Sequence, residues 1–212
     1  MAREHEKIYD DWSKVTVAQY DAMVKIQEKH SEDAAKYIVE MLYGIDDAER
    51  LPMHVYSAYL AGLRSFHRQD VRAAQLTKDA TYRVGDTTYR VNLSPNAFTA
   101  GQYIDFVNSV RDKAPMARVL TALIVPDGHE YNDGYDVGKA AEDMGKLPVT
   151  AAFAVFNFFG EWSRRSIRTS LRFLASQIQM RRGADKERKA KVEELKNRLQ
   201  ELYRLMASYP TF

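Results

Sequence analysis

The spacing of apolar residues limits what this chain can fold into more than any other feature. Over most of its length apolar side chains recur at intervals of three and four, as between Pro52 and His67, which is the pattern of a helix with one apolar face. Only residues 80–93 change to a period of two, on both sides of Gly85-Asp86, and that pattern is typical of a β-hairpin. The sequence therefore predicts a mainly α-helical fold with one small β-hairpin.

The chain has 212 residues, which is enough for one large domain or two small ones. We expect an N-terminal arm over residues 1–15, a helical region over 16–148 that contains the hairpin, and long C-terminal helices over 149–212. Within the middle region helices are expected at 97–113 and 115–125. Since a two-stranded hairpin is only marginally stable alone, it must pack on helices or pair with a strand of another chain.

A short motif occurs twice in the middle region. The segment Thr16–Tyr20, Thr-Val-Ala-Gln-Tyr, is echoed by Thr99–Tyr103, Thr-Ala-Gly-Gln-Tyr, and each copy is followed by an apolar helix and a leucine-proline step. Two interpretations stay open: the match arose by chance, or the region holds two duplicated helical units, 16–79 and 97–148. Duplication predicts that the two tyrosines occupy equivalent, partly buried positions.

Residues 149–212 have the features of a long helical hairpin. Between Val149 and Arg182 the only strong helix breaker is Gly160, so one long helix is expected there. After Gly183 a seam of apolar residues follows at intervals of three and four, namely Val192, Leu195, Leu199, Leu202, Met206 and Tyr209. This seam spans fewer than three heptads, so we expect it to dock on neighbouring helices of this chain or of another copy.

The segment between Glu161 and Lys191 is strongly basic, although the whole chain carries a formal charge of only +2. Helical spacing places Arg164, Arg168 and Arg172 on one face, with Arg165 beside them. Such a stripe binds phosphates or an acidic protein surface, or it is a solvated basic face balanced by acids of the N-terminal half. The predicted partner-binding residues are therefore these four arginines together with Leu195, Leu199, Leu202 and Met206 of the seam.

The residues that usually carry catalysis are scattered or missing. The chain has no cysteine, and no two of its five histidines stand four residues apart as a helical metal pair would. Phosphate-binding loops, dinucleotide fingerprints and nucleophile elbows do not occur either. Residues 127–136 are rich in Asp, Asn and Gly, but without the spacing of an EF-hand, so a solvated loop is the better interpretation. We predict no catalytic residue, no metal site and no cofactor.

We expect no secretory signal in this sequence. Residues 1–11 are charged and lack the apolar stretch of a secretory signal. The most apolar run, Val149–Phe159, is too short to span a bilayer. We therefore expect no membrane partner.

Three segments resemble parts of small proteins from bacteriophage structural gene clusters. They are Trp12-Ser-Lys-Val-Thr-Val-Ala-Gln-Tyr20, Phe98-Thr-Ala-Gly-Gln-Tyr-Ile-Asp105 and Leu147-Pro-Val149, and the nearest likenesses are to phages of Bacteroides-type hosts and the crAss-like group. Some of those proteins are tail assembly chaperones, and others are virion components of the tail or the internal cargo. The resemblance covers residues 12–160 and brings no catalytic residues with it.

The resemblance implies a non-enzymatic bacteriophage morphogenesis or virion structural protein that acts through protein–protein contacts. Its expected partners are other phage structural proteins and further copies of itself. Its expected location is the cytoplasm of the host bacterium during assembly, or the virion. The alternative is a nucleic-acid-associated protein that uses the basic helix, and salt-dependent binding to mixed-sequence DNA would distinguish the two.

Overall fold

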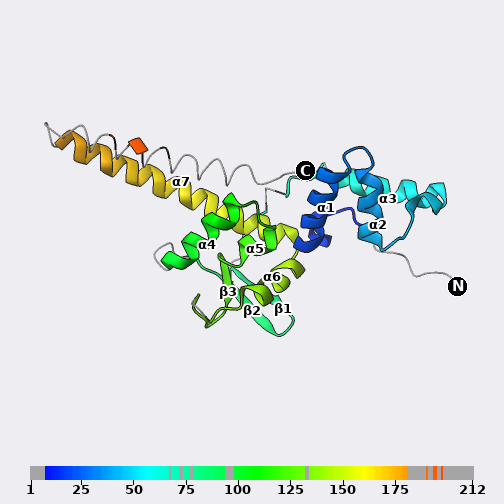
Figure 1. Ribbon diagram of the computed structural model, residues 1–212, viewed down its shortest axis with the longest axis horizontal. Helices are drawn as coiled ribbons and strands as arrows, with labels where there is room; N and C mark the ends of the chain where they lie inside the picture. Colours follow the sequence, from blue (N-terminus) through cyan, green and yellow to red (C-terminus); the bar gives the residue numbers. More distant parts are fainter. Residues whose placement is uncertain are drawn as a thin grey trace. The chain divides into compact units, whose positions relative to one another are not determined.

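The computed structural model describes residues 8–66, 68–71, 74–76, 79–93, 98–131 and 134–180, and the single positions 190, 193, 194 and 197 (Figure 1). The fold is mainly helical, as the apolar periodicity predicts. The α-helices are α1 (Val17–Lys29), α2 (Ala34–Tyr43), α3 (Met53–Phe66), α4 (Ala100–Arg111), α5 (Met116–Leu120), α6 (Val137–Lys146) and α7 (Val149–Met180). Two 3-10 helices, η1 (Trp12–Lys14) and η2 (Ala48–Arg50), precede α1 and α3.

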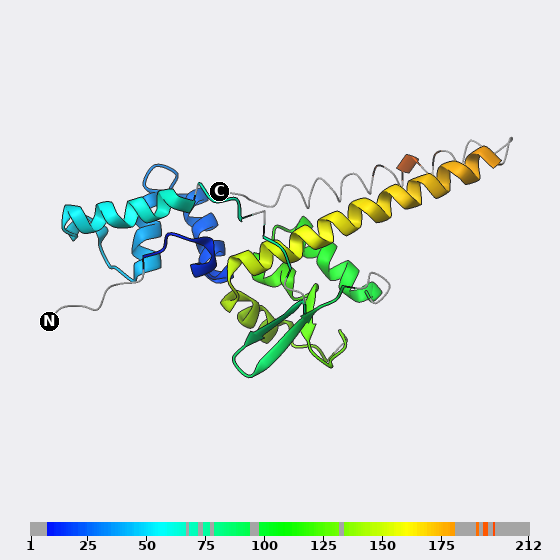
Figure 2. The same ribbon diagram turned by 180° about the vertical axis from the view of Figure 1, so that it is seen from behind.

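The predicted hairpin is present and belongs to a sheet of three antiparallel strands. β1 (Thr81–Val84) pairs with β2 (Thr87–Val91), and β2 pairs with β3 (Ile124–Pro126). The loop between β1 and β2 contains Gly85 with φ 56°, a conformation that favours glycine. Figure 2 shows this hairpin beside α6, which contacts β1. The hairpin is thus stabilised within the chain, by a third strand and a helix.

The chain divides between Val155 and Phe156 into two compact units, and α7 runs from the first into the second. The one long helix expected from Val149 is therefore present as far as Met180. The apolar residues of the seam, from Val192 to Tyr209, lie outside the described residues, and of the second half of the predicted C-terminal hairpin only the single positions 190, 193, 194 and 197 are described.

In the first unit α1 is the central helix, because it contacts α2, α5 and α6. It buries Val17, Tyr20 and Met23. Backbone hydrogen bonds from Val17 N to Leu147 O (2.8 Å) and from Val149 N to Val15 O (2.9 Å) join its start to the start of α7. The leucine-proline step before α7 is therefore a packing element.

A carboxylate on α1 also caps a neighbouring helix. Asp21 accepts hydrogen bonds from the backbone amides of Met116 (2.8 Å) and Ala117 (3.2 Å), at the start of α5. Pro115, the N-cap residue of α5, makes no capping bond with its own side chain. Burial raises the pKa of Asp21, while the two amide hydrogen bonds act in the opposite direction. The short α5 is thus held by a cap that comes from α1.

The two copies of the repeated motif form the same local structure but pack differently. Thr16 with Gln19, and Thr99 with Gln102, each make a complete capping box. Tyr20 is 1% exposed, whereas Tyr103 is 49% exposed. The helix α4 instead turns Gln102, Phe106 and Val110 inward. The prediction of equivalent burial is therefore wrong for Tyr103, and the capping box by itself accounts for the shared threonine and glutamine.

Candidate functional site

The region from α2 to α3 reverses direction through a short, well-capped connection. Gly44 ends α2 in the left-handed conformation with φ 62°, as the glycine at this position predicts. The side chain of Glu40 accepts a hydrogen bond from Ala48 N (3.0 Å), and Asp47 accepts one from Glu49 N (3.1 Å). These bonds fix η2 between the two helices, so that α2 and α3 lie against each other.

The helices α2 and α3 enclose an apolar cluster that is only partly covered. Its buried members are Val39, Ala48 and Tyr59, and Tyr59 stacks on Tyr43 with ring centroids 3.8 Å apart. Around them lie seven half-buried apolar side chains, which are Tyr43, Ile45, Leu51, Val55, Tyr56, Leu60 and Leu63. Each of these seven side chains keeps part of its surface exposed, and that surface is available to a partner.

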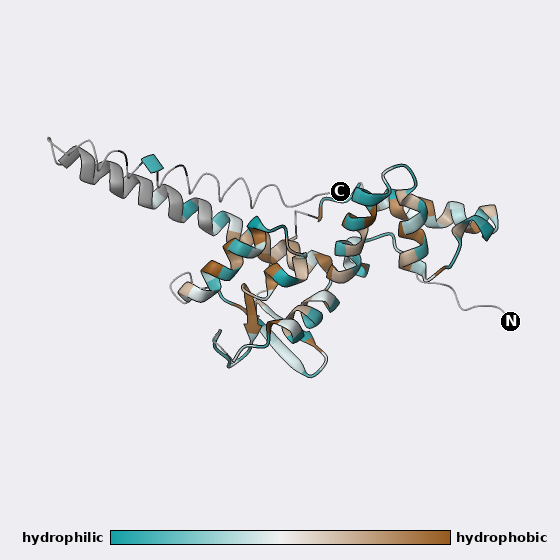
Figure 3. Ribbon diagram, viewed as in Figure 1, coloured by the Kyte–Doolittle hydropathy of each residue, from teal (hydrophilic) through white to brown (hydrophobic). Residues whose placement is uncertain are grey.

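One side of α3 carries the open edge of this cluster. Met53, Tyr56, Leu60 and Leu63 follow one another at intervals of three, four and three, and we call them the α3 stripe. Met53 is 77% exposed, and the other three are half-buried. Figure 3 shows hydrophobic positions recurring along α3. This spacing is that of a helix face that receives another helix.

The two ends of α3 carry opposite charges. Asp46, Asp47 and Glu49 precede the helix, whereas Arg64 and Arg68 stand at its end. Asp47 pairs with Arg50 at 2.9 Å and Glu49 pairs with Lys36 at 2.6 Å. Asp46, Arg64 and Arg68 are exposed, and none of them has an ion-pair partner within the part of the chain that the structure describes. The α3 stripe therefore runs from an acidic end to a basic end.

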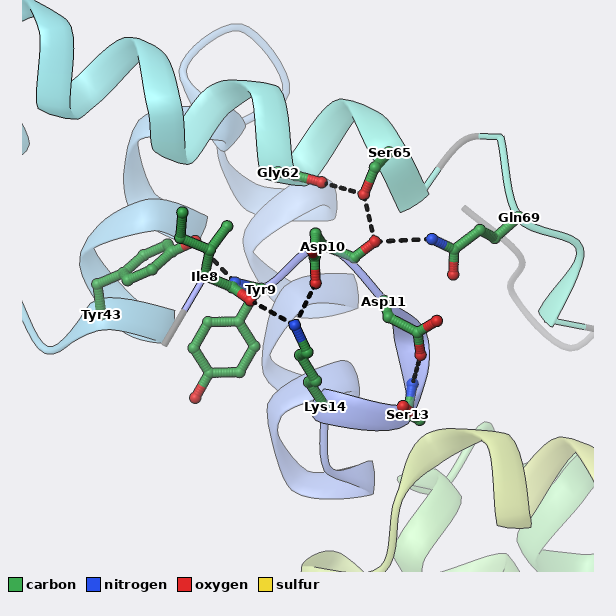
Figure 4. A network of polar contacts seen from close by, with 10 residues as sticks. All are labelled: Ile8, Tyr9, Asp10, Asp11, Ser13, Lys14, Tyr43, Gly62, Ser65 and Gln69. Atoms are coloured by element: carbon green, nitrogen blue, oxygen red, sulfur yellow. Dashed lines mark hydrogen bonds and ion pairs between the residues drawn. The ribbon is translucent and has the colours of Figure 1, made fainter. Parts of the chain in front are cut away.

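Another side of α3 is covered by the segment Ile8–Lys14, which we call the N-terminal strap (Figure 4). The carbonyl of Asp10 accepts hydrogen bonds from Ser65 Oγ and from Gln69 Nε2. Trp12 donates from Nε1 to Phe66 O (3.2 Å) and stacks on the Phe66 ring at 4.4 Å. Part of the expected N-terminal arm is thus packed on α3.

The strap reaches α2 as well. Tyr9 N donates to the hydroxyl of Tyr43 at 3.0 Å, and the two rings meet edge to face at 5.3 Å. The Tyr9 hydroxyl accepts a hydrogen bond from Gln19 Nε2 of α1 at 3.2 Å. The strap therefore links all of the first three helices.

The residues predicted to bind a partner fall largely outside what the structure describes. The α7 backbone is helical at Arg164, Arg165, Arg168 and Arg172. Of these side chains only that of Arg165 is described, and it is exposed, with Nη2 3.6 Å from a carboxylate oxygen of Glu161. The seam residues Leu195, Leu199, Leu202 and Met206 lie outside the described residues. Both parts of the predicted site stay predictions.

The acidic loop after β3 is engaged in structural contacts. Asp127 forms an ion pair with Arg90 (2.8 Å), and Asp136 caps α6 through Lys139 N (3.0 Å). Tyr131 donates to Asp105 of α4 at 2.6 Å, and burial together with this bond raises the pKa of the tyrosine. Among the described residues no group of three or more His, Cys, Asp or Glu is placed to hold a metal ion.

The chain matches no protein-family model, no curated protein and no solved structure. Within the described residues no helix is long and apolar enough to cross a membrane.

Proposed function

We propose that the chain is a non-enzymatic bacteriophage morphogenesis or virion structural protein that works by burying apolar helix faces against other proteins. Its role is that of a tail component, an internal cargo protein or a tail assembly chaperone. The observation that carries the proposal is the half-covered cluster between α2 and α3, whose open edge is the α3 stripe. The resemblance of residues 12–160 to phage structural proteins supplies the biological setting.

The binding free energy that this surface can provide is small. It therefore fits an assembly of many copies better than a single tight complex. Covering the exposed Met53 contributes on the order of 1 kcal/mol, and completing the burial of each of the three half-buried side chains contributes less than about 1 kcal/mol. The four side chains together contribute a few kcal/mol, and the loss of translational and rotational freedom offsets much of that gain. A weak contact of this kind becomes effective when many copies act together, as they do in a phage particle.

Mass spectrometry of purified virions, and of assembly intermediates from infected cells, tests this function. We expect the chain at a defined stoichiometry in mature particles if it is a tail or cargo protein. An assembly chaperone appears in the intermediates and is missing from the particles. A chain that is expressed during infection and is found in neither preparation contradicts the proposal.

The second candidate is a nucleic-acid-associated protein, and the observation that favours it is the basic segment of α7. This helix is continuous through Arg164, Arg168 and Arg172, so its backbone places the three residues along one side. Neutralising several phosphates makes the affinity for DNA fall steeply with salt. Binding to mixed-sequence DNA with such a salt dependence, together with the absence of the chain from virion and assembly fractions, would favour this candidate.

Replacing Arg164, Arg168 and Arg172 together by glutamine is expected to leave the fold intact. At low salt it should weaken association with the partner of the basic helix, which is an acidic protein surface or DNA. The difference from the parent should shrink as salt rises, because screening removes the charge contribution in both proteins. Pull-down of the partner over a series of salt concentrations measures it. A matched control replaces three exposed lysines of the first unit, Lys25, Lys29 and Lys113. Equal effects in the two variants would show that the net charge of the chain, and not the position of the three arginines, determines the association.

A further inference from the structure

We propose that the partner of the α3 stripe is a second copy of this chain, docked so that the two α3 helices run antiparallel across a two-fold axis. The proposal rests on the proposed function, because it assigns a partner to the same half-covered surface. It adds which molecule binds there, in which direction, and which residues decide that direction.

The spacing of the stripe fits such a contact. A two-fold axis at the middle of the stripe places Met53 opposite the partner's Leu63 and Tyr56 opposite the partner's Leu60. Each large side chain then meets an apolar one, and no charged residue belongs to the stripe. A contact between identical surfaces must be self-complementary in this way.

The charges at the ends of α3 select the antiparallel direction. With the axis between Tyr56 and Leu60, residues 46–50 lie across from residues 66–70 of the partner, so the acidic end with Asp46 lies beside the partner's Arg68. A parallel arrangement would place acid beside acid and base beside base. Opposite charges across an interface fix orientation and suppress the alternative arrangement. The exposed Asp46 and Arg68 thereby gain partners that no described residue of their own chain provides.

The stripe is open on the side that the contact needs. The N-terminal strap contacts Gly62, Ser65 and Phe66, and these positions lie on other sides of the helix than Met53, Tyr56 and Leu60. α3 has 14 residues, so the contact is about 21 Å long at a rise of about 1.5 Å per residue. An interface of that length is small, and we expect a dimer with a Kd on the order of micromolar.

Sedimentation velocity over a concentration series, up to about 1 mM, tests the dimer with the full chain. The parent should change from 24.4 kDa to twice that mass as concentration rises. Met53→Lys should raise the Kd at least about tenfold, because it places a charge in the apolar contact, beside the like charge of the partner's Arg64. It should not disturb the fold, since the side chain is exposed. Ala58→Lys, at an exposed position on the opposite side of α3, is the matched control and should leave the Kd unchanged.

Exchanging two opposite charges tests the antiparallel direction of the two α3 helices. Arg68→Glu and Asp46→Arg should each raise the Kd roughly three- to tenfold, and the double variant should restore the parent value. The two residues lie beyond opposite ends of α3 in one chain, so a restored affinity reports contact between chains. Circular dichroism confirms the helical content of every variant.

Three results would overturn the inference: a parent that stays monomeric throughout, a dimer that tolerates Met53→Lys, or a double variant weaker than either single one. The proposed function fails separately. A monomeric chain found in virions leaves the phage role intact and shows that the stripe binds a different protein. A dimer found in neither virions nor intermediates leaves this inference intact and removes the phage role.

Discussion

Gly62→Val is expected to lower the free energy of unfolding by about 3 kcal/mol, because the valine side chain would collide with the N-terminal strap. A Cβ atom at Gly62 would lie 2.6 Å from the carbonyl oxygen of Tyr9 and 3.2 Å from Ile8 Cγ2. The nearer atom belongs to the backbone, which cannot move aside as the end of a side chain can. The strap must then leave α3, and it gives up the hydrogen bonds of Asp10 and Trp12 as it does so.

Gly62→Ala is a second test, because the expected sign of its effect on stability is the opposite of the usual one. In an unhindered helix glycine to alanine stabilises by up to about 1 kcal/mol. Gly62→Ala should instead destabilise, since even one methyl group meets the Tyr9 carbonyl. Gly101→Ala is the control, because its Cβ finds no atom nearer than Thr99 Oγ1 at 3.8 Å, and it should be neutral or mildly stabilising. Urea unfolding followed by circular dichroism measures all three variants. A stabilised Gly62→Ala protein would mean that the strap does not lie on α3.

Local signals in the sequence predict local structure well in this chain. Thr16 begins α1 as its N-cap, Gly44 ends α2, and Gly85 lies in the turn between two strands. Each of these features depends on a few neighbouring residues, so the sequence around it contains the whole cause. The mainly helical fold follows from the same kind of signal.

Features that depend on distant residues could not be predicted in this way. The helix expected over 115–125 is wrong beyond Leu120, because Ile124–Pro126 forms β3. A short, continuous apolar run does not distinguish a helix from a buried strand. What decides the strand is its pairing with β2, for example Val91 with Ile124. The N-terminal strap has no periodic pattern at all.

The candidate surface on α3 could also be predicted only in part from the sequence. Apolar periodicity from Val55 to Phe66 indicates a one-sided helix, and the sequence shows that this face needs a partner. It cannot show which apolar residues α2 and the strap cover, and which stay open. Tyr59 and Leu60 are neighbours of similar character, yet Tyr59 is buried and Leu60 half-buried. Only the tertiary contacts separate a core position from a docking position.

Tyr89→Phe is expected to lower the free energy of unfolding by about 2 kcal/mol at neutral pH, because it leaves a buried carboxylate without one of its donors. The Tyr89 hydroxyl donates to Asp143 Oδ2 at 2.7 Å, and Lys146 Nζ donates to Asp143 Oδ1 at 2.8 Å. Tyr89 lies on β2 and Asp143 on α6, so the bond joins the sheet to its helix. Tyr82→Phe is the control, since Tyr82 pairs with Tyr89 across the hairpin and no described residue hydrogen-bonds to its hydroxyl.

The loss of stability in Tyr89→Phe should also depend on pH in a defined direction. The hydrogen bonds from Lys146 and then Tyr89 hold the pKa of Asp143 below its ordinary value, although burial opposes them. A carboxyl with a lowered folded-state pKa contributes stability above its unfolded pKa of about 3.9 and loses that contribution as the pH falls through the folded value. In Tyr89→Phe one cause of the lowered pKa is missing. The difference between parent and variant should therefore be full above about pH 5 and shrink below about pH 4. Urea unfolding at the two pH values measures the difference, and a gap that stays constant or widens in acid would show that the Asp143 carboxylate does not depend on Tyr89.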